Sequence, residues 1–208
     1  MPIIRELQHI AAVNDNERSV PRDCVCLLAE LVNPNPITRR WAARDLADCP
    51  DSAGALVARL TCEDDASVRE VILSALTFLG DKEAIAGLVQ CLRSDSASLR
   101  NEAIEGMKQM PDQVAPIMRG LLNDHDADVR IFAVNILESL RHPEVEPWLI
   151  AVIENDPQVN VCAAAVDLLG EVGSDASRHA LQCLKARFSD EPYIQFATDL
   201  ALKRLSQA

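Results

Sequence analysis

Apolar residues recur at helical spacing in paired segments that are separated by short polar turns. In most second segments, small or apolar residues stand three and seven positions after a fixed reference position, as Ala133 and Leu137 do after Arg130. This spacing puts them on one side of a helix. The expected first helices are 22–32, 52–62, 82–93, 112–123, 144–154 and 176–188, and the expected second helices are 36–48, 66–79, 97–109, 127–140, 158–172 and 191–206. We therefore expect an all-α chain of about six helix pairs.

A short phrase at the start of the second helices repeats along the chain. Asp65 to Arg69 reads Asp-Ala-Ser-Val-Arg, and close copies end at Arg100 and Arg130, with a weaker copy ending at Arg39. The equivalent positions are 39, 69, 100, 130, 162 and 195, so the repeat is about 31 residues long. A period between about 20 and 50 residues is typical of proteins built from stacked repeats.

Residues that start and stop helices agree with this division. Asp65, Ser96 and Asp126 stand just before second helices, where a side-chain oxygen accepts hydrogen bonds from free backbone N–H groups. Gly80 and Gly173 follow second helices, where a residue in the left-handed conformation ends a helix. The helix boundaries are therefore expected near these positions.

The N-terminal segment is expected to form a separate element. Residues 2–13 carry apolar side chains on one helical face, and a polar stretch follows them. A terminal repeat has no neighbour to cover its outer face. We therefore predict a capping helix and linker in 1–21 and a single elongated array in 22–208.

The repeated motif resembles a known family. Residues 126–137 read Asp-x-x-Val-Arg-x-x-Ala-x-x-x-Leu, and 65–76 are close to the same pattern. The motif is similar to the HEAT repeat, in the short bacterial form called the phycobilisome-lyase HEAT-like repeat, over about 22–206. The resemblance implies a right-handed α-solenoid whose second helices line a concave side. It is nearly silent on function, because the family includes scaffolds, adaptors, a DNA glycosylase branch and bilin lyases.

An arginine occupies the reference position, which we call the ladder position, in the first four pairs: Arg39, Arg69, Arg100 and Arg130. These arginines could form a basic row for an anionic partner. They could instead bind acidic residues of their own or the next repeat, for which the candidates are Asp65, Asp95 and Asp126. A planar guanidinium is suited to bridging a carboxylate and helix-end carbonyls, and the resemblance implies that these groups tie adjacent loops together. We therefore predict a structural role.

Positions one, two and five after the ladder position should face outward on the second helices. The candidate partner-binding residues are Arg40, Trp41, Arg44, Glu70, Glu102, Glu105, Ile131, Phe132, Asn135 and Phe196. Large apolar residues among them are typical of a contact site. The acidic residues would suit a basic or amphipathic segment of another protein. The alternatives are that the aromatic residues pack between helices and that the acidic residues form a solvated face.

Charge and composition exclude several classes of protein. The net charge of −12 argues against a general nucleic-acid binder. No run of 18 apolar residues is present, so a membrane span is not expected. The N-terminus becomes charged at once, unlike a secretory signal. Seven cysteines at scattered positions suit reduced thiols in the cytoplasm better than a disulfide framework.

The chain lacks the sequence patterns of common catalytic and metal sites. It has no Gly-rich phosphate loop and no Gly-x-Ser-x-Gly turn. The histidines are scattered, and no His-Glu dipeptide is present. We therefore expect no catalytic residues, no metal and no cofactor.

These observations favour a non-enzymatic adaptor or assembly factor that binds a partner protein on the concave face of a HEAT-repeat solenoid. The alternative is a bilin-lyase-like chaperone that helps to attach a cofactor to a client protein. A glycosylase of the HEAT-like type is disfavoured, because its concave face must be basic to hold phosphates. The sequence does not identify the partner, the pathway or the oligomeric state.

Overall fold

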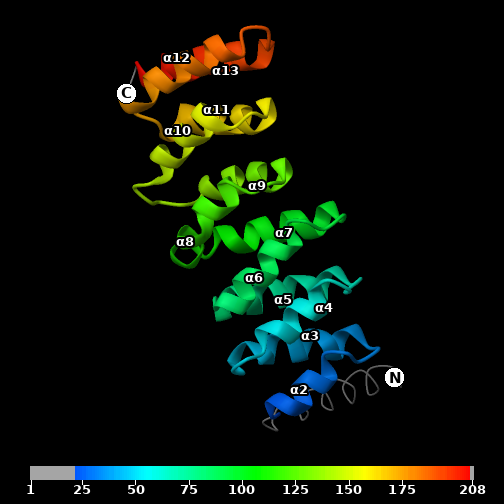
Figure 1. Ribbon diagram of the computed structural model, residues 1–208. Coiled ribbons are helices and arrows are strands. Elements are labelled where there is room, and N and C mark those ends of the chain that lie inside the picture. The colour runs from blue at the N-terminus through cyan, green and yellow to red at the C-terminus, as the bar shows by residue number, and fades with distance from the viewer. Residues whose placement is uncertain (1–21, 207–208) are drawn as a thin grey trace, which may run out of the picture. The chain divides into compact units, whose positions relative to one another are not determined.

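The computed structural model describes residues 22–206, which fold into two compact units divided between Ala75 and Leu76 (Figure 1). Twelve α-helices and two short 3-10 helices lie within these residues, and no β-strand does. In chain order they are α2 (Cys24–Glu30), α3 (Pro36–Asp45), η1 (Leu46–Asp48), α4 (Ala53–Leu60), α5 (Ala66–Leu79), α6 (Lys82–Cys91), α7 (Ala97–Lys108), α8 (Pro111–Leu122), α9 (Ala127–Leu137), α10 (Val145–Asn155), α11 (Val159–Val172), η2 (Asp175–Ser177), α12 (Arg178–Arg187) and α13 (Pro192–Leu205).

The prediction of an all-α fold of six helix pairs is confirmed. Every expected helix is present, and its ends lie within a few residues of the expected positions. The expected capping helix in 1–21 lies outside the described residues, so the division into 1–21 and 22–208 stays a prediction.

The first unit contains α2, α3, η1, α4 and most of α5. In it, α2 packs on α3 and on η1, which continues the chain directly from α3. In the second unit, the first helices α8, α10 and α12 form one layer, and the second helices α7, α9, α11 and α13 form the other (Figure 1). Each first helix from α6 onward also packs on the second helix that follows it.

The apolar stripe of the second helices forms the core of both units. In the first five pairs, the residues three and seven positions after the ladder position are essentially inaccessible to solvent: Ala42, Leu46, Ile72, Leu76, Ala103, Met107, Ala133, Leu137, Ala165 and Leu169. Several are alanines, whose small side chains let neighbouring helices pack closely at the density of protein interiors. Repeat spacing therefore identifies the core correctly.

Side-chain caps begin the second helices as expected. The Asp65 carboxylate accepts hydrogen bonds from the backbone N–H groups of Ser67 and Val68, and Asp126 accepts one from Asp128. At the other end, Gly80 has a φ of 55° and ends α5 in the left-handed conformation, as predicted. The same prediction is wrong for Gly173, which has a φ of −71°. Glycine is needed there because a Cβ would lie 2.4 Å from the carbonyl oxygen of Leu169.

The ladder arginines make structural contacts, and two of them are buried against a carboxylate. Arg39 donates two hydrogen bonds to Glu63, at 2.7 and 2.6 Å, and Arg130 donates two to Asp156, at 2.6 and 3.0 Å. Each acidic partner lies in the neighbouring repeat, as one of the two alternatives required, but the partners are Glu63 and Asp156 and not the candidates Asp65 and Asp126. Glu63 and Asp156 lie just after the first helix of the following pair, α4 and α10 respectively. The long arginine side chain reaches from its own helix to that turn.

All four ladder arginines also bind backbone carbonyls of the turn just before their own helix. Arg39 donates to Asn33 and Pro34, Arg69 to Glu63 and Asp64, Arg100 to Ser94, and Arg130 to Asp124 and His125. These carbonyls lie at the end of a first helix, where no intrahelical donor is available. The four ladder arginines therefore all stabilise the turn between the two helices of their own pair.

The last two pairs, which lack a ladder arginine, fix their turns with other side chains. Arg187, at the end of α12, donates hydrogen bonds to the carbonyls of Ile153, Glu154 and Asp156, and it lies 3.2 Å from the Cys162 sulfur. In the sixth pair, the Gln195 amide donates to the carbonyls of Lys185 and Phe188. The turn is therefore stabilised in every pair, although the donor changes.

Glu63 is the most strongly perturbed acid in the first unit. Its side chain is fully buried, which by itself would raise its pKa. Hydrogen bonds from Arg39 and Arg59 outweigh this effect and lower its pKa to about 2. The carboxylate is therefore charged in the folded protein well below neutral pH.

The cysteines differ from expectation at one place. Cys24 and Cys49 form a disulfide, with their Cα atoms 5.8 Å apart, so the prediction of reduced thiols is wrong for this pair. The bond joins the start of α2 to the residue after η1. The remaining five cysteines are free. Within the described chain, no helix has the length and apolar character needed to cross a bilayer.

Candidate functional site

Two surfaces of the second unit can hold a partner or a ligand. We call the outer side of α7, α9, α11 and α13 the second-helix surface, and the space between α8 and α10 the α8–α10 cleft. The predicted partner-binding residues include residues of the second-helix surface, whereas the α8–α10 cleft contains only one residue that the sequence singled out, the ladder arginine Arg130. No group of histidine, cysteine and acidic residues suited to a metal ion occurs within 22–206.

The second-helix surface carries six of the predicted partner-binding residues. Phe196 is 66% exposed on α13, whereas Ile131 and Phe132 on α9 are half-buried. The Arg100 guanidinium lies 5.8 Å from the centre of the Phe132 ring and covers one side of it. Glu105 and Asn135 are exposed, and Glu102 is half-buried. Their role in binding stays a prediction.

An apolar stripe on α13 extends this surface beyond the predicted residues. Tyr193, Phe196 and Leu200 are 53%, 66% and 38% exposed, and their spacing places them on one face of the helix. The Tyr193 hydroxyl donates a hydrogen bond of 2.7 Å to Asp167 on α11. Sequence reasoning missed Tyr193, although its position three residues before Phe196 was a usable signal.

Two shallow grooves on the second-helix surface are acidic. One of about 260 Å³ lies between α9 and α11, and one of about 200 Å³ lies between α11 and α13. Asp167 and Glu171 line both grooves, Glu138 lines the first, and the single cation of the two linings, Arg204, lies in the second. Apolar anchors beside carboxylates suit a segment of the opposite charge.

The remaining predicted residues lie in the first unit. Arg40 and Arg44 are exposed on α3, and Glu70 is exposed on α5. Trp41 is half-buried, and the Arg44 guanidinium lies 4.4 Å from the centre of its ring. This arrangement is a cation–π contact. An Arg–Trp pair of this kind is common in protein interfaces.

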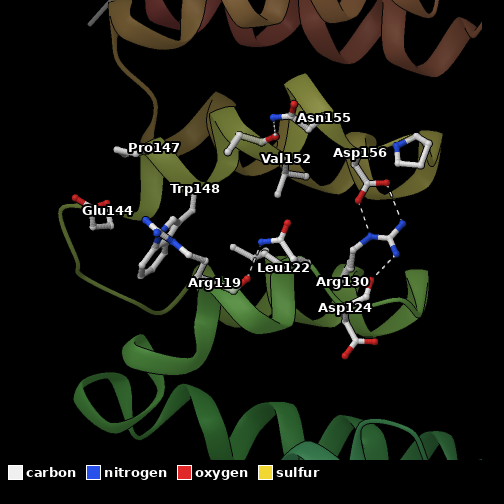
Figure 2. A pocket seen from close by; sticks show the side chains of 13 residues that line it. Arg119, Leu122, Asp124, Arg130, Glu144, Pro147, Trp148, Val152, Asn155 and Asp156 are labelled. Carbon is white, nitrogen blue, oxygen red and sulfur yellow. Dashed lines mark hydrogen bonds and ion pairs between the residues drawn. The ribbon is translucent and has the colours of Figure 1, made fainter.

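The α8–α10 cleft has a volume of about 500 Å³ and is the largest of the spaces described here. Trp148 and Pro147 of α10 line one end, and the Arg130–Asp156 pair lies at the other end (Figure 2). The Trp148 ring is stacked on His142, with the ring centres 5.3 Å apart and the planes within 4° of parallel. The stack holds the indole ring against His142 at this end of the cleft.

Polar groups line the cleft between its ends. Arg119, near the end of α8, extends toward Trp148 (Figure 2). The amide groups of Asn123 and Asn155 donate to carbonyls of their own helices, at 2.7 and 2.8 Å. Their oxygens accept no hydrogen bond from another described residue. The cleft therefore combines one aromatic wall, two guanidinium groups, of which that of Arg130 is paired with Asp156, and several acceptor atoms.

Comparison with known proteins settles the family. A sequence profile of HEAT repeats matches residues 26–108 and 114–203. This chain belongs to the HEAT-repeat family. The repeat motif, the helix pairs and the buried stripe of the HEAT-repeat chain all agree with that assignment.

Two curated relatives of this HEAT-repeat chain have the same name. Bilin biosynthesis protein PecE from Nostoc sp. (strain PCC 7120 / SAG 25.82 / UTEX 2576) is 28% identical over 150 residues, which are 70% of this chain and 58% of the relative. Bilin biosynthesis protein PecE from Mastigocladus laminosus is 39% identical over 71 residues, which are 33% of this chain and 26% of the relative. The chain thus spans less than two thirds of the length of either relative.

Solved structures also align with the chain. An engineered protein is 21% identical, covers 90% of this chain and all of its own, and has a TM-score of 0.43. A complex of CpcE and CpcF of phycocyanin lyase from Nostoc sp. PCC7120 contains a chain that is 17% identical, with 90% of this chain and 96% of that chain covered and a TM-score of 0.38.

Proposed function

We propose that this HEAT-repeat protein is a bilin-lyase-like factor, which binds a phycobiliprotein subunit and assists the attachment of its bilin chromophore. The observation that carries the proposal is the 28% identity to a bilin biosynthesis protein across 70% of the chain. The alignment is long enough to include most of the repeats, so it concerns more than one shared motif.

Attachment of a bilin to a client thiol requires few reactive groups from the assisting protein. When a thiol of the client adds to a carbon–carbon double bond of the bilin, a C–S bond forms and the thiol hydrogen passes to the neighbouring carbon. No group leaves and no oxidant is consumed. A protein that holds client and bilin in one orientation accelerates such a step by proximity. This fits a chain in which the described residues offer surfaces and no evident catalytic constellation.

The second-helix surface supplies the features of a client site. Phe196 and Tyr193 are exposed apolar anchors, and Asp167 and Glu171 lie in the grooves beside them. Large exposed aromatic residues contribute most of the binding energy in many interfaces. We infer that a basic or amphipathic segment of the client binds on this surface.

The test combines client binding with chromophore attachment. The full chain is mixed with a phycobiliprotein apo-subunit and a bilin, and covalent adduct is measured by bilin fluorescence after denaturing electrophoresis. We expect faster adduct formation than without the chain, and a complex of chain and apo-subunit on size-exclusion chromatography. Absence of both the complex and the acceleration would contradict the proposal.

A second candidate is an adaptor that binds a partner protein without handling bilin. The observation that favours it is the exposed stripe of Tyr193, Phe196 and Leu200, which needs only a protein to cover it. The adaptor would be favoured by a stable complex of this chain with the apo-subunit, together with an adduct rate that is the same with and without this chain.

A further inference from the structure

We propose that the α8–α10 cleft binds the bilin itself, as a linear tetrapyrrole whose rings lie against Trp148 and whose carboxylate is held by Arg119. The inference rests on the proposed function for the identity of the ligand. It adds the position of the ligand, on the first-helix side of the second unit and away from the second-helix surface.

The size and shape of the cleft suit an elongated small molecule. Its volume of about 500 Å³ falls within the usual range of small-molecule sites. It runs along α10 from Trp148 to Asp156, which corresponds to about 12 Å of helix axis. The buried Arg130–Asp156 pair lies at one end and Trp148 at the other, so a long ligand would extend between them (Figure 2).

The aromatic wall suits a flat conjugated body. Trp148 is half-buried and stacked on His142, so the indole is held in place before any ligand arrives. Pro147 and Pro157 add further apolar surface at the two ends. A fixed aromatic face binds a planar π system at small cost in conformational entropy.

Arg119 is the cation of the cleft that is available to an anion. Arg130, the other arginine in the lining, is neutralised by Asp156. Arg119 forms no ion pair with any residue in 22–206, and its side chain is exposed. A guanidinium can hold a carboxylate with two parallel hydrogen bonds. A propionate group of a tetrapyrrole carries such a carboxylate.

The acceptor atoms of the cleft match the other half of the ligand. The amide oxygens of Asn123 and Asn155 and the carboxylate of Glu144 accept no hydrogen bond within the described chain. They can accept from N–H groups but would repel a purely anionic ligand. A cleft with one cation and several acceptors therefore selects a planar molecule that carries both carboxylates and a row of N–H donors. A linear tetrapyrrole has both.

The experiment is a binding titration of the full chain with biliverdin, followed by visible absorbance. We expect Arg119→Gln to weaken binding roughly tenfold, since a charge-assisted hydrogen bond is lost. Trp148→Phe should weaken it roughly fivefold through lost stacking. Lys82→Gln, which removes one exposed positive charge from α6 in the same unit, is the matched control and should bind as the wild type does.

Two further arms make the assignment specific. Biliverdin dimethyl ester, whose carboxylates are blocked, should bind wild type more weakly than biliverdin does and should bind wild type and Arg119→Gln equally. In a Trp41→Phe background Trp148 is the only tryptophan of the chain, so its fluorescence should be quenched as biliverdin binds. Thermal unfolding of each variant shows whether it has folded.

The outcomes separate this inference from the proposed function. If folded Arg119→Gln and Trp148→Phe both bind biliverdin as wild type does, or if wild type does not bind it, the cleft is not the bilin site. The proposed function then still stands if the wild type accelerates adduct formation on the apo-subunit. If wild type binds biliverdin in the cleft but neither forms a complex with the apo-subunit nor accelerates adduct formation, the proposed function is overturned and the cleft assignment stands.

Discussion

The two faces of the second unit differ in how they arise from the repeat. The second-helix surface is formed by equivalent positions of successive pairs, so its grooves are shallow and similar, at about 260 and 200 Å³. The α8–α10 cleft holds about 500 Å³ and depends on features that occur once, namely Trp148, His142 and the seven-residue connection from Glu138 to Glu144. In this unit, equivalent positions of the repeat form a broad surface with shallow grooves. Residues that do not follow the repeat form the larger cleft.

The largest expected effect comes from Arg130→Met. Arg130 belongs to α9 of the second-helix layer, but its guanidinium binds Asp156 at the closed end of the cleft. The substitution leaves a buried carboxylate without its partner, which costs about 3 kcal/mol or more. Denaturant unfolding should show this loss, and biliverdin binding should weaken. Unfolding at an unchanged midpoint would mean that the pair does not stabilise the junction.

Glu63→Gln offers a matched change in the other unit. Because the pKa of folded Glu63 is about 2, against 4.5 for the ordinary carboxyl, its contribution is fully present above about pH 4.5 and is lost as the pH falls toward 2. The shift corresponds to about 3 kcal/mol, as an order of magnitude. The variant should be destabilised at neutral pH, and its stability should fall less than that of wild type on acidification. Biliverdin binding should not change, since Glu63 is not part of the cleft.

A smaller effect is expected from the double change Phe132→Ala, Phe196→Ala on the second-helix surface. Loss of two aromatic anchors should weaken binding of the apo-subunit by about 2 kcal/mol, as measured by isothermal titration calorimetry. Val32→Ala, a similarly exposed apolar residue in the first unit, is the control. If the double change weakens biliverdin binding instead, the two faces are not separate sites.

The smallest effect is expected from Arg187→Met. Arg187 donates to three carbonyls of the turn beside Asp156, and each net hydrogen bond contributes about 1 kcal/mol. Water can replace part of this loss, because the residue is exposed. We therefore expect a loss of about 1 kcal/mol in the free energy of unfolding. A loss as large as that of Arg130→Met would show that the replacement donor is as important as a ladder arginine.

The sequence predicted the repeat and its core because both depend on spacing. Ala133 and Leu137 are buried since they lie three and seven residues after Arg130, and the same spacing gives buried residues in the first, second, third and fifth pairs. Asp65 and Asp126 cap their helices because the cap is a contact between residues close in sequence. Local contacts of this kind can be inferred without coordinates.

Contacts between pairs could not be inferred in the same way. Glu63 and Asp156 receive Arg39 and Arg130 across 24 and 26 residues, whereas the candidate Asp126 stands in the same turn as Arg130 and was the more obvious choice. Trp148 stacks on His142, which lies six residues earlier in the connection before α10. The cleft depends on that connection, and no repeat pattern describes it.

Arg187 also has a consequence for any shortened version of the chain. The fifth pair has Cys162 at its ladder position and obtains its missing donor from the pair that follows. Cutting the chain after α11 would remove this donor and leave the carbonyls of Ile153, Glu154 and Asp156 without it. The final pair is therefore a part of its neighbour's folding unit, and a fragment without it should unfold from its new end.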